Sequence, residues 1–224
     1  MKKNTILLIG ALAFIFFGCE KKGYLIDGGV HNPKVDMTTY DYLKTNRVFD
    51  TLLILIDKAG LKETINGDVT FFAPTDFSIV NYVTAKRGDM LGINPFSNFR
   101  LDSIPKATLR DTLKMYIIPG KINRSDMTKE GKIYTTLMGN KVHIALVPVQ
   151  DAYVGKVTTW PEYVFFTKVV GAGLDVPGTI PPPSELDIRN VCQTSGIITN
   201  TGILHVIENS HTMFYFVQTH FPSN

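Results

Sequence analysis

The segment that decides the fold is residues 69–77, which read VTFFAPTDF. Its first residues favour β structure, and Pro74 ends a strand because it has no backbone N–H to donate. Thr75 can then cap a helix, and Asp76 places a negative charge in the first turn, where the helix dipole favours it. Apolar residues recur after the corner at helical spacing, at Phe77, Val80 and Val83. The segment therefore predicts a strand, a sharp turn and the start of a helix.

A second segment, residues 201–208, reads TGILHVIE. The first segment contains Phe72, Ala73, Pro74, Thr75 and Asp76, which match the first signature box of the fasciclin domain, Phe-Ala-Pro-Thr-Asp, letter for letter. The second segment resembles the family's other box, Asn-Gly-Val-Ile-His-Val-Ile-Asp, with Gly202 and His205 at its glycine and histidine. The two boxes stand in the family's order, about one domain apart. The chain thus resembles a fasciclin domain, which implies that both boxes lie close together in the core.

The patterns around the boxes change from helices to strands along the chain. Helical spacing covers residues 39–59 and resumes near Pro105, with a polar loop predicted over residues 85–104. Strands are predicted at residues 133–137, 142–147, 153–158, 163–170, 190–199 and 203–207, with an apolar strand tail at 214–216. Together with the resemblance, this predicts an α+β fold: one fasciclin-type domain over residues 36–217, with a mixed β-sheet and packed N-terminal helices.

The chain begins with a pattern typical of export. Two lysines, a short apolar run and a small residue precede Cys19, which predicts a signal peptide over residues 1–18. The position of Cys19 resembles the lipid-attachment cysteine of bacterial lipoproteins, and residues 19–35 then form the lipidated cysteine and a flexible tether. The alternative is an uncleaved anchor, but a membrane-spanning helix needs about 20 apolar residues and this run is shorter. We expect a cell-envelope, outer-membrane lipoprotein, and leave open whether it faces the surface or the periplasm.

Charge and cysteine content exclude other classes of protein. The net charge is +3, and the two lysines of the signal contribute most of it, so no nucleic-acid footprint remains. With Cys19 lipidated, Cys192 has no partner for a disulfide. A leftover thiol in an exported protein can react or pair between molecules, but the strand-like neighbours of Cys192 favour a buried small hydrophobe.

A search for catalytic patterns predicts no enzyme. The sequence has no Gly-x-Ser-x-Gly elbow, no His-Glu-x-x-His and no phosphate-binding Gly-x4-Gly-Lys-Ser/Thr, so an envelope hydrolase lacks a visible nucleophile and base. His205 and His211 lack a convergent carboxylate or thiolate, so we predict no metal and no cofactor. The simpler interpretation of His205 is a half-buried ring that pins its hairpin through hydrogen bonds to the backbone.

The resemblance also indicates where family activities do not transfer. The Tyr-His pair implicated in receptor adhesion by animal members falls here on Met115 and Tyr116. The other adhesive pair, Asp-Ile, falls on Gly196 and Ile197. Integrin-like recognition is therefore not expected from these positions.

Aromatic residues suggest a different binding site. Tyr153, Trp160 and Tyr163 cluster in the stretch that joins two predicted strands. Exposed rings beside polar groups stack on sugars or anchor partners, but single aromatic residues also form cores. The two interpretations are balanced for Trp160, and a core position is favoured for Tyr163. Loops on a rigid scaffold usually carry binding residues, and residues 151–183 are favoured here over residues 85–104.

These observations predict a non-enzymatic envelope lipoprotein that binds or scaffolds at the outer membrane. The Asp27–Gly29 stretch after the anchor and the His211-Thr212 pair resemble lipoproteins that accompany glycan-import systems. That resemblance implies glycan or outer-membrane transporter proteins as partners. The alternative is a cell–cell or matrix adhesion protein.

Overall fold

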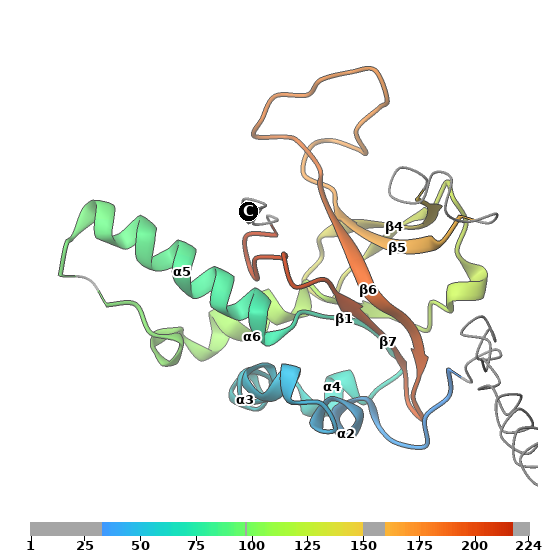
Figure 1. Ribbon diagram of the computed structural model, residues 1–224, viewed down its shortest axis with the longest axis horizontal. Helices are drawn as coiled ribbons and strands as arrows, with labels where there is room; N and C mark the ends of the chain where they lie inside the picture. Colours follow the sequence, from blue (N-terminus) through green and yellow to red (C-terminus); the bar gives the residue numbers. More distant parts are fainter. Residues whose placement is uncertain (1–32, 97, 150–159, 217–224) are drawn as a thin grey trace, which may run out of the picture. The chain divides into compact units, whose positions relative to one another are not determined.

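The computed structural model describes residues 33–96, 98–149 and 160–216, and a seven-stranded sheet forms the centre of this part of the chain. The strand order is β2-β1-β7-β6-β5-β4-β3 (Figure 1). The strands are β1 Val69–Ala73, β2 Ile117–Pro119, β3 Lys132–Thr135, β4 Lys141–Pro148, β5 Glu162–Lys168, β6 Ile188–Ile198 and β7 Ile203–Ile207. The neighbours β1 and β7 run parallel, whereas the other paired strands are antiparallel. The predicted α+β fold with a mixed sheet is confirmed.

The two signature segments supply neighbouring interior strands of this sheet, β1 and β7. Every residue of β1 and of β7 is buried. Strands that are covered on both faces need continuous apolar runs, and VTFFA and ILHVI provide them. The parallel pair accordingly lies inside the sheet, between β2 and β6, and neither of its strands has a solvent-facing side.

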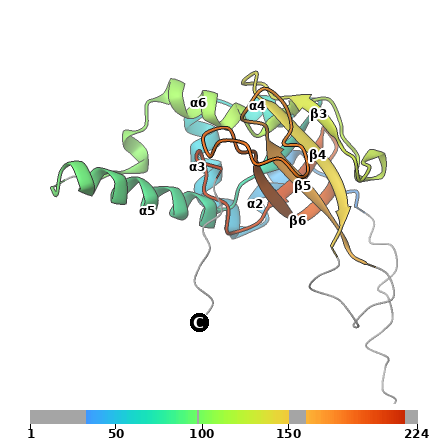
Figure 2. The same ribbon diagram turned by 90° about the horizontal axis from the view of Figure 1, so that it is seen from above.

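Helices cover the part of the sheet that contains β1. They are α2 Thr39–Lys44, α3 Asp50–Ala59, α4 Lys62–Ile65, α5 Asp76–Ile93 and α6 Lys106–Lys114, with 3₁₀ turns η2 Arg47–Phe49, η3 Leu101–Ser103 and η4 Arg124–Asp126. Buried apolar residues recur along α3 and α6 and fill the space against the sheet: Leu52, Leu53, Ile56, Leu109 and Leu113. Helix α5 is different, because most of its length projects away from the sheet (Figures 1 and 2).

The predicted polar loop over residues 85–104 is wrong in its first half, where α5 continues. Two glycines in this stretch disfavour a helix by about 1 kcal/mol each. Tertiary contacts outweigh that cost: Arg87 Nε donates to the carbonyl oxygen of Phe99 at 3.1 Å, and the Tyr215 hydroxyl donates to Asp89 at 2.8 Å. The chain that returns along α5 and the C-terminal segment thus hold the helix.

The predicted strand tail at residues 214–216 is also wrong. The segment forms turns, and Phe214 and Phe216 adopt positive φ angles of 71° and 62°. Phe216 is fully buried and stacks on Tyr116 with 4.9 Å between the ring centroids. The end of the described chain therefore packs its Phe216 ring into the core and does not extend the sheet.

The strands predicted at residues 133–137 and 142–147, and those at 190–199 and 203–207, pair as two hairpins. β3 and β4 pair through a turn in which Gly139 has φ +93°, and β6 and β7 form the final hairpin. The predicted strand at residues 153–158 lies outside the described residues, as does Cys19. Pro33 and Val35, in the predicted tether, hydrogen-bond to the backbone of Ile198 in β6.

No helix among the residues that the structure describes is both long enough and apolar enough to cross a membrane. Cys192 belongs to the hydrophobic core, where it is buried as a small apolar side chain. Burial raises the pKa of its thiol.

Candidate functional site

The two signature segments contact each other through an aromatic stack. Phe72 of β1 lies opposite His205 of β7 in the sheet register. Their rings lie 4.7 Å apart at an angle of 12°, and Phe166 of β5 packs on Phe72 at 4.6 Å. The histidine is therefore part of the hydrophobic core, with no exposed surface.

His205 also completes the hydrogen bonding of an irregular position in β6. The register between β6 and β7 passes from Thr194↔Val206 to Ile197↔Leu204, so two residues of β6 face His205 alone. This is a β-bulge, in which an extra residue is left without a ladder partner. The Gly196 N–H donates to His205 Nδ1 at 3.2 Å, and Nε2 faces the carbonyl oxygen of Ile122 at 3.5 Å. Because Nδ1 accepts, the proton of the neutral ring lies on Nε2.

Burial also controls the protonation of this ring. Desolvation lowers the pKa of His205 to about 4, so the ring is neutral at physiological pH. A ring that is buried, neutral and hydrogen-bonded to backbone on both sides has no atom left for catalysis. The predicted hydrogen bonding of His205 to backbone is present, but the ring is fully buried and not half-buried as predicted. Its effect on stability is taken up in the Discussion.

Asp76 and Thr75 join separate parts of the fold. The carboxylate of Asp76 accepts hydrogen bonds from the backbone N–H groups of Thr51 and Leu52, at 2.9 to 3.1 Å. It thus satisfies the first turn of α3 as well as lying in the first turn of α5. Thr75 precedes α5, but its hydroxyl donates to Asn209 Oδ1 and does not cap the helix. Pro74 follows β1 directly and ends the strand. At this strand-to-helix corner, the side chains of Thr75 and Asp76 thus bond other parts of the fold.

Gly202 is required by a close backbone approach. A Cβ atom at this position would lie 2.5 Å from the carbonyl oxygen of Val69, which is well inside van der Waals contact. The glycine therefore lets the β6–β7 turn pass against the start of β1.

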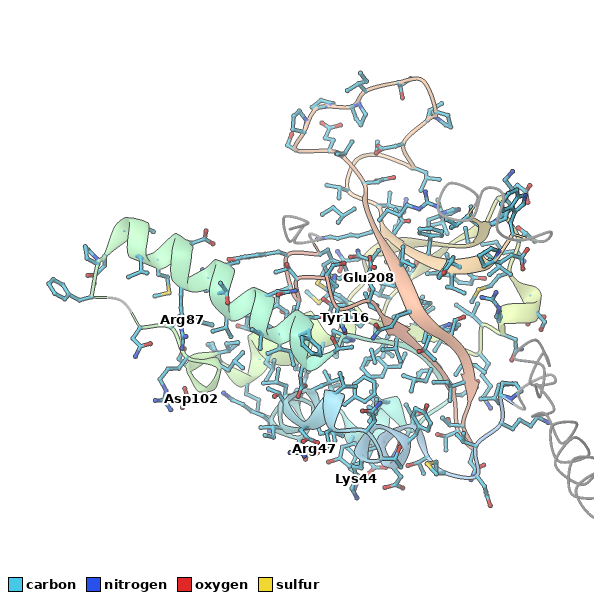
Figure 3. All side chains as sticks on the ribbon, viewed as in Figure 1. Lys44, Arg47, Arg87, Asp102, Tyr116 and Glu208 are labelled. Atoms are coloured by element: carbon cyan, nitrogen blue, oxygen red, sulfur yellow. The ribbon has the colours of Figure 1, made fainter. Side chains whose placement is uncertain are left out.

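A second buried polar chain lies beside the first. The Tyr116 hydroxyl lies 2.8 Å from His211 Nε2, and His211 Nδ1 lies 2.8 Å from Asn190 Oδ1 (Tyr116 is labelled in Figure 3). The Phe214 N–H donates to the Tyr116 hydroxyl. Asn190 Oδ1 can only accept, so the Nδ1–H of the neutral His211 ring donates to it. Nε2 is then an acceptor, and the Tyr116 O–H donates to it. Desolvation raises the pKa of Tyr116 and lowers the pKa of His211 to about 3, so both groups stay neutral.

Outside this core, one face of β4, β5 and β6 carries an open groove of about 360 Å³. Its floor follows the strand alternation, because Ala145 lies opposite Phe165 and His143 lies opposite Thr167 in the register. Alternate residues of the same strands, such as Ile144 and Phe166, point into the core. The groove is lined by Lys129, His143, Ala145, Val147, Phe165, Thr167, Leu174, Asp175, Asp187 and Arg189.

Arg189 is the most distinctive side chain of this groove. It is exposed, and its guanidinium carbon lies 3.5 Å from the centroid of the Phe165 ring. Partial burial of the guanidinium lowers the pKa of Arg189 through desolvation. Within residues 33–96, 98–149 and 160–216, no carboxylate lies within salt-bridge distance of its guanidinium. The ring thus holds a cation whose donors the fold does not use.

Two aspartates of the groove are used by the fold. Asp175 and Asp187 each accept a hydrogen bond from the other's backbone N–H at 2.9 Å, and Asp187 also accepts from the Val170 N–H at 3.0 Å. These contacts close the base of the loop that joins β5 to β6, which extends far from the sheet in Figure 1. The loop is fixed where it borders the groove.

A second hollow, of about 410 Å³, lies between α5 and the chain near η3. Its charged groups already have partners, because Arg87 donates to the Phe99 carbonyl and Arg100 pairs with Asp102 at 3.0 Å. Arg87 and Asp102 are both labelled in Figure 3. The groove on the sheet is therefore the better candidate for a binding site.

Comparison with known proteins identifies the family. The sequence model of the fasciclin domain matches residues 47–168, which is more than half of the chain. The chain belongs to the fasciclin family. A solved structure with a similar arrangement is a FAS1 domain pair from the insect cell adhesion molecule fasciclin I, at 11% identity and a TM-score of 0.46. The alignment covers 76% of this chain and 49% of that one, so this chain spans about half the length of the domain pair. No curated protein matches the sequence.

Of the four positions that correspond to the adhesive pairs, Tyr116, Gly196 and Ile197 are buried and Met115 is partly buried. Tyr116, at the second position of the Tyr-His pair, has no exposed surface and is hydrogen-bonded to His211. Gly196, at the aspartate position of the Asp-Ile pair, lies in the bulge with φ +78°, and Ile197 is 8% exposed. Gly196 has no side chain, and the side chains of Tyr116 and Ile197 belong to the core.

Of the three aromatic residues singled out from the sequence, the two that the structure describes, Trp160 and Tyr163, do not line the groove. Trp160 is partly buried just before β5, and Tyr163 lies on β5 opposite Val147, two residues before Phe165. Tyr153 lies outside the described residues. The role predicted for these rings remains a prediction. The alternation of polar and apolar residues in β4 and β5 is the sequence signal that could have pointed to the groove instead.

Among the residues that the structure describes, no group of three or more His, Cys, Asp or Glu side chains gathers in a way that would hold a metal ion. The chemistry that the groove offers is recognition: one stacked cation, one lysine, and donors and acceptors on a rigid sheet.

Proposed function

We propose that this fasciclin protein is a non-enzymatic cell-envelope lipoprotein that binds a glycan in the groove on β4, β5 and β6. In this proposal, Cys19 anchors the chain in the outer membrane, and the bound glycan passes to an import system whose transporter proteins are its partners. The observation that carries the proposal is the groove itself, which combines apolar walls with polar groups on strands that the core holds rigid. The signature residues cannot serve this purpose, because their polar atoms are engaged within the fold.

The mixed lining supports a sugar ligand over a purely apolar one. One face of a sugar ring is more apolar than the other because it presents C–H groups. The hydroxyls around the ring both donate and accept hydrogen bonds. Val147 and Leu174 supply apolar walls, while Thr167 and His143 supply polar atoms. Such a combination of a few placed polar groups within an apolar surface is typical of small-molecule sites.

A blocking substitution tests this function. Leu174 lines the groove and is 38% exposed, so Leu174→Arg should fill the groove with little effect on folding. Ile180 lies in the same loop, is 96% exposed and does not line the groove, so Ile180→Arg is the matched control. On a glycan array, the full-length protein should bind at least one glycan class, Leu174→Arg should lose it and Ile180→Arg should retain it. Equal binding by all three proteins would place the site elsewhere, and no binding to any glycan would refute the function.

The second candidate function is adhesion to a protein on another cell or in the matrix. It is favoured by exposed apolar residues of the β5–β6 loop, where Val176, Ile180 and Leu186 are 61%, 96% and 50% exposed. Exposed apolar groups on a loop with a fixed base suit contact with a protein. Under this alternative, Ile180→Arg should abolish aggregation of cells that display the protein, whereas Leu174→Arg should not.

A further inference from the structure

The groove has a chemical bias that narrows the class of glycan, and this inference rests on the proposed function. Arg189 stands near the start of β6, opposite Thr167 of β5. Its guanidinium is stacked at 3.5 Å from the Phe165 ring centroid. A guanidinium carries five N–H donors in a rigid fork that matches the two oxygens of a carboxylate. Because the ring already fixes the guanidinium, binding an anion would cost less side-chain entropy than it would at a free arginine.

The charges around the groove leave the cations available and the carboxylates occupied. Lys129 and Arg189 line the groove, and neither forms a salt bridge with a described residue. Asp175 and Asp187 also line it, but both point at backbone N–H groups at the base of the loop. A ligand therefore meets an open guanidinium fork beside carboxylates that already accept hydrogen bonds.

The remaining polar groups favour hydroxyls next to the anion. His143 Nε2 lies 2.8 Å from the carbonyl oxygen of Glu130, which can only accept, so Nε2 carries the proton. The other ring nitrogen, Nδ1, is then an acceptor. Thr167 adds a hydroxyl that can donate or accept, and Oδ1 of Asp175 accepts no hydrogen bond from a described residue. Hydroxyl groups of a sugar can use all three.

We propose that the groove recognises an acidic sugar, a uronic acid residue of a glycan, with its carboxylate held by the guanidinium of Arg189. Lys129 adds a second positive charge, His143 and Thr167 bond the ring hydroxyls, and Val147 and Leu174 contact the apolar face of the ring. The volume of about 360 Å³ lies at the small end of ligand pockets, roughly 300–1,000 Å³, so the groove takes one or two sugar residues of a longer chain.

The test uses the full-length protein in detergent and calorimetric titration with oligomers of galacturonate, glucuronate and mannuronate. The comparison ligands are the same oligomers with each carboxylate reduced to a primary alcohol. We expect at least one uronide to bind, and its reduced counterpart to bind about tenfold more weakly or worse. Arg189→Gln should weaken uronide binding by a similar factor, and Arg189→Lys should recover only part of it, because an ammonium lacks the fork.

The matched control is Arg47→Gln, which removes the same charge from a side chain that is 97% exposed and lies on η2, among the helices (Figure 3). It should bind uronides like the parent, and all variants should keep the parent's thermal midpoint within a few degrees. Two outcomes would overturn the inference and leave the proposed function standing. One is uronide binding that does not change in Arg189→Gln, and the other is equal binding of the uronides and their reduced counterparts. Binding of peptides with a free C-terminal carboxylate in place of uronides would overturn the assignment to sugar acids. Failure of every acidic and neutral oligomer to bind would refute both proposals.

Discussion

Replacing His205 by alanine is the most informative test of the core, because this one side chain joins both signature segments. The change removes the acceptor of the Gly196 N–H in the β-bulge and the group that faces the Ile122 carbonyl. It also removes the ring that stacks on Phe72. The methyl group of alanine replaces none of these contacts.

The expected cost follows from those contacts. A buried N–H without an acceptor costs about 1–3 kcal/mol, and the contact with Ile122, at 3.5 Å, adds little. Removing a fully buried ring leaves a cavity, and aromatic-to-alanine changes in cores cost about 3–5 kcal/mol in total. We therefore expect His205→Ala to lower the free energy of unfolding by about 3–4 kcal/mol, a large part of the roughly 5–15 kcal/mol of a typical domain.

The pH dependence gives a second and independent readout. The native pKa of His205 is lowered to about 4 from 6.5, so the unfolded chain binds a proton between these values while the native protein does not. Stability is therefore complete above pH 6.5 and falls as the pH drops towards 4, by up to about 1.4 kcal/mol per pH unit. His211 acts in the same direction, with a native pKa of about 3. Near pH 5, His205→Ala should therefore lose the part of the pH dependence of stability that comes from His205. It should keep the part that comes from His211.

Urea denaturation at pH 7.5 and at pH 5 measures both effects. His143→Ala is the control, because this ring bonds the exposed carbonyl of Glu130, and its loss should cost about 1 kcal/mol or less. A His205→Ala protein as stable as its parent, or one with an unchanged slope against pH, would refute the structural interpretation. A protein that stays stable but loses glycan binding would make His205 a site residue.

Three further predictions concern other parts of the chain. Cys19→Ala should move the protein from the detergent-rich to the aqueous phase in a partition assay, and unchanged partitioning would refute the lipid anchor. Gly202→Ala should destabilise the fold by about 1–3 kcal/mol, because its Cβ would lie 2.5 Å from the Val69 carbonyl oxygen; denaturation of Gly173→Ala, where a Cβ meets nothing within 4 Å, provides the reference. Trp160→Ala should weaken binding to glycans or envelope fractions with a nearly unchanged thermal midpoint, whereas lower stability with intact binding would place this ring in the core.

Local sequence was sufficient for the centre of the fold and insufficient for its periphery. The strand and corner at residues 69–77 and the final hairpin could be predicted because their apolar runs, proline and turn residues act over a few positions. Helix α5 could not, because its continuation depends on distant partners: Phe99 for Arg87, and Tyr215 for Asp89. The end of the chain failed for the same reason, since Phe216 is held by Tyr116, far away in the sequence.

The groove was missed because no single stretch of sequence contains it. Its walls come from β4, β5, β6 and the loop after β5, and the register alone brings Arg189 beside Phe165. In the sequence, exposed aromatic residues are the signal used to predict a site. In the groove, however, the aromatic ring is that of the buried Phe165, and it contacts the guanidinium of Arg189. The same register explains why the core tolerates such a surface. Alternate residues of β4, β5 and β6 serve the core and the groove separately, so the residues that line the groove are not those that hold the fold.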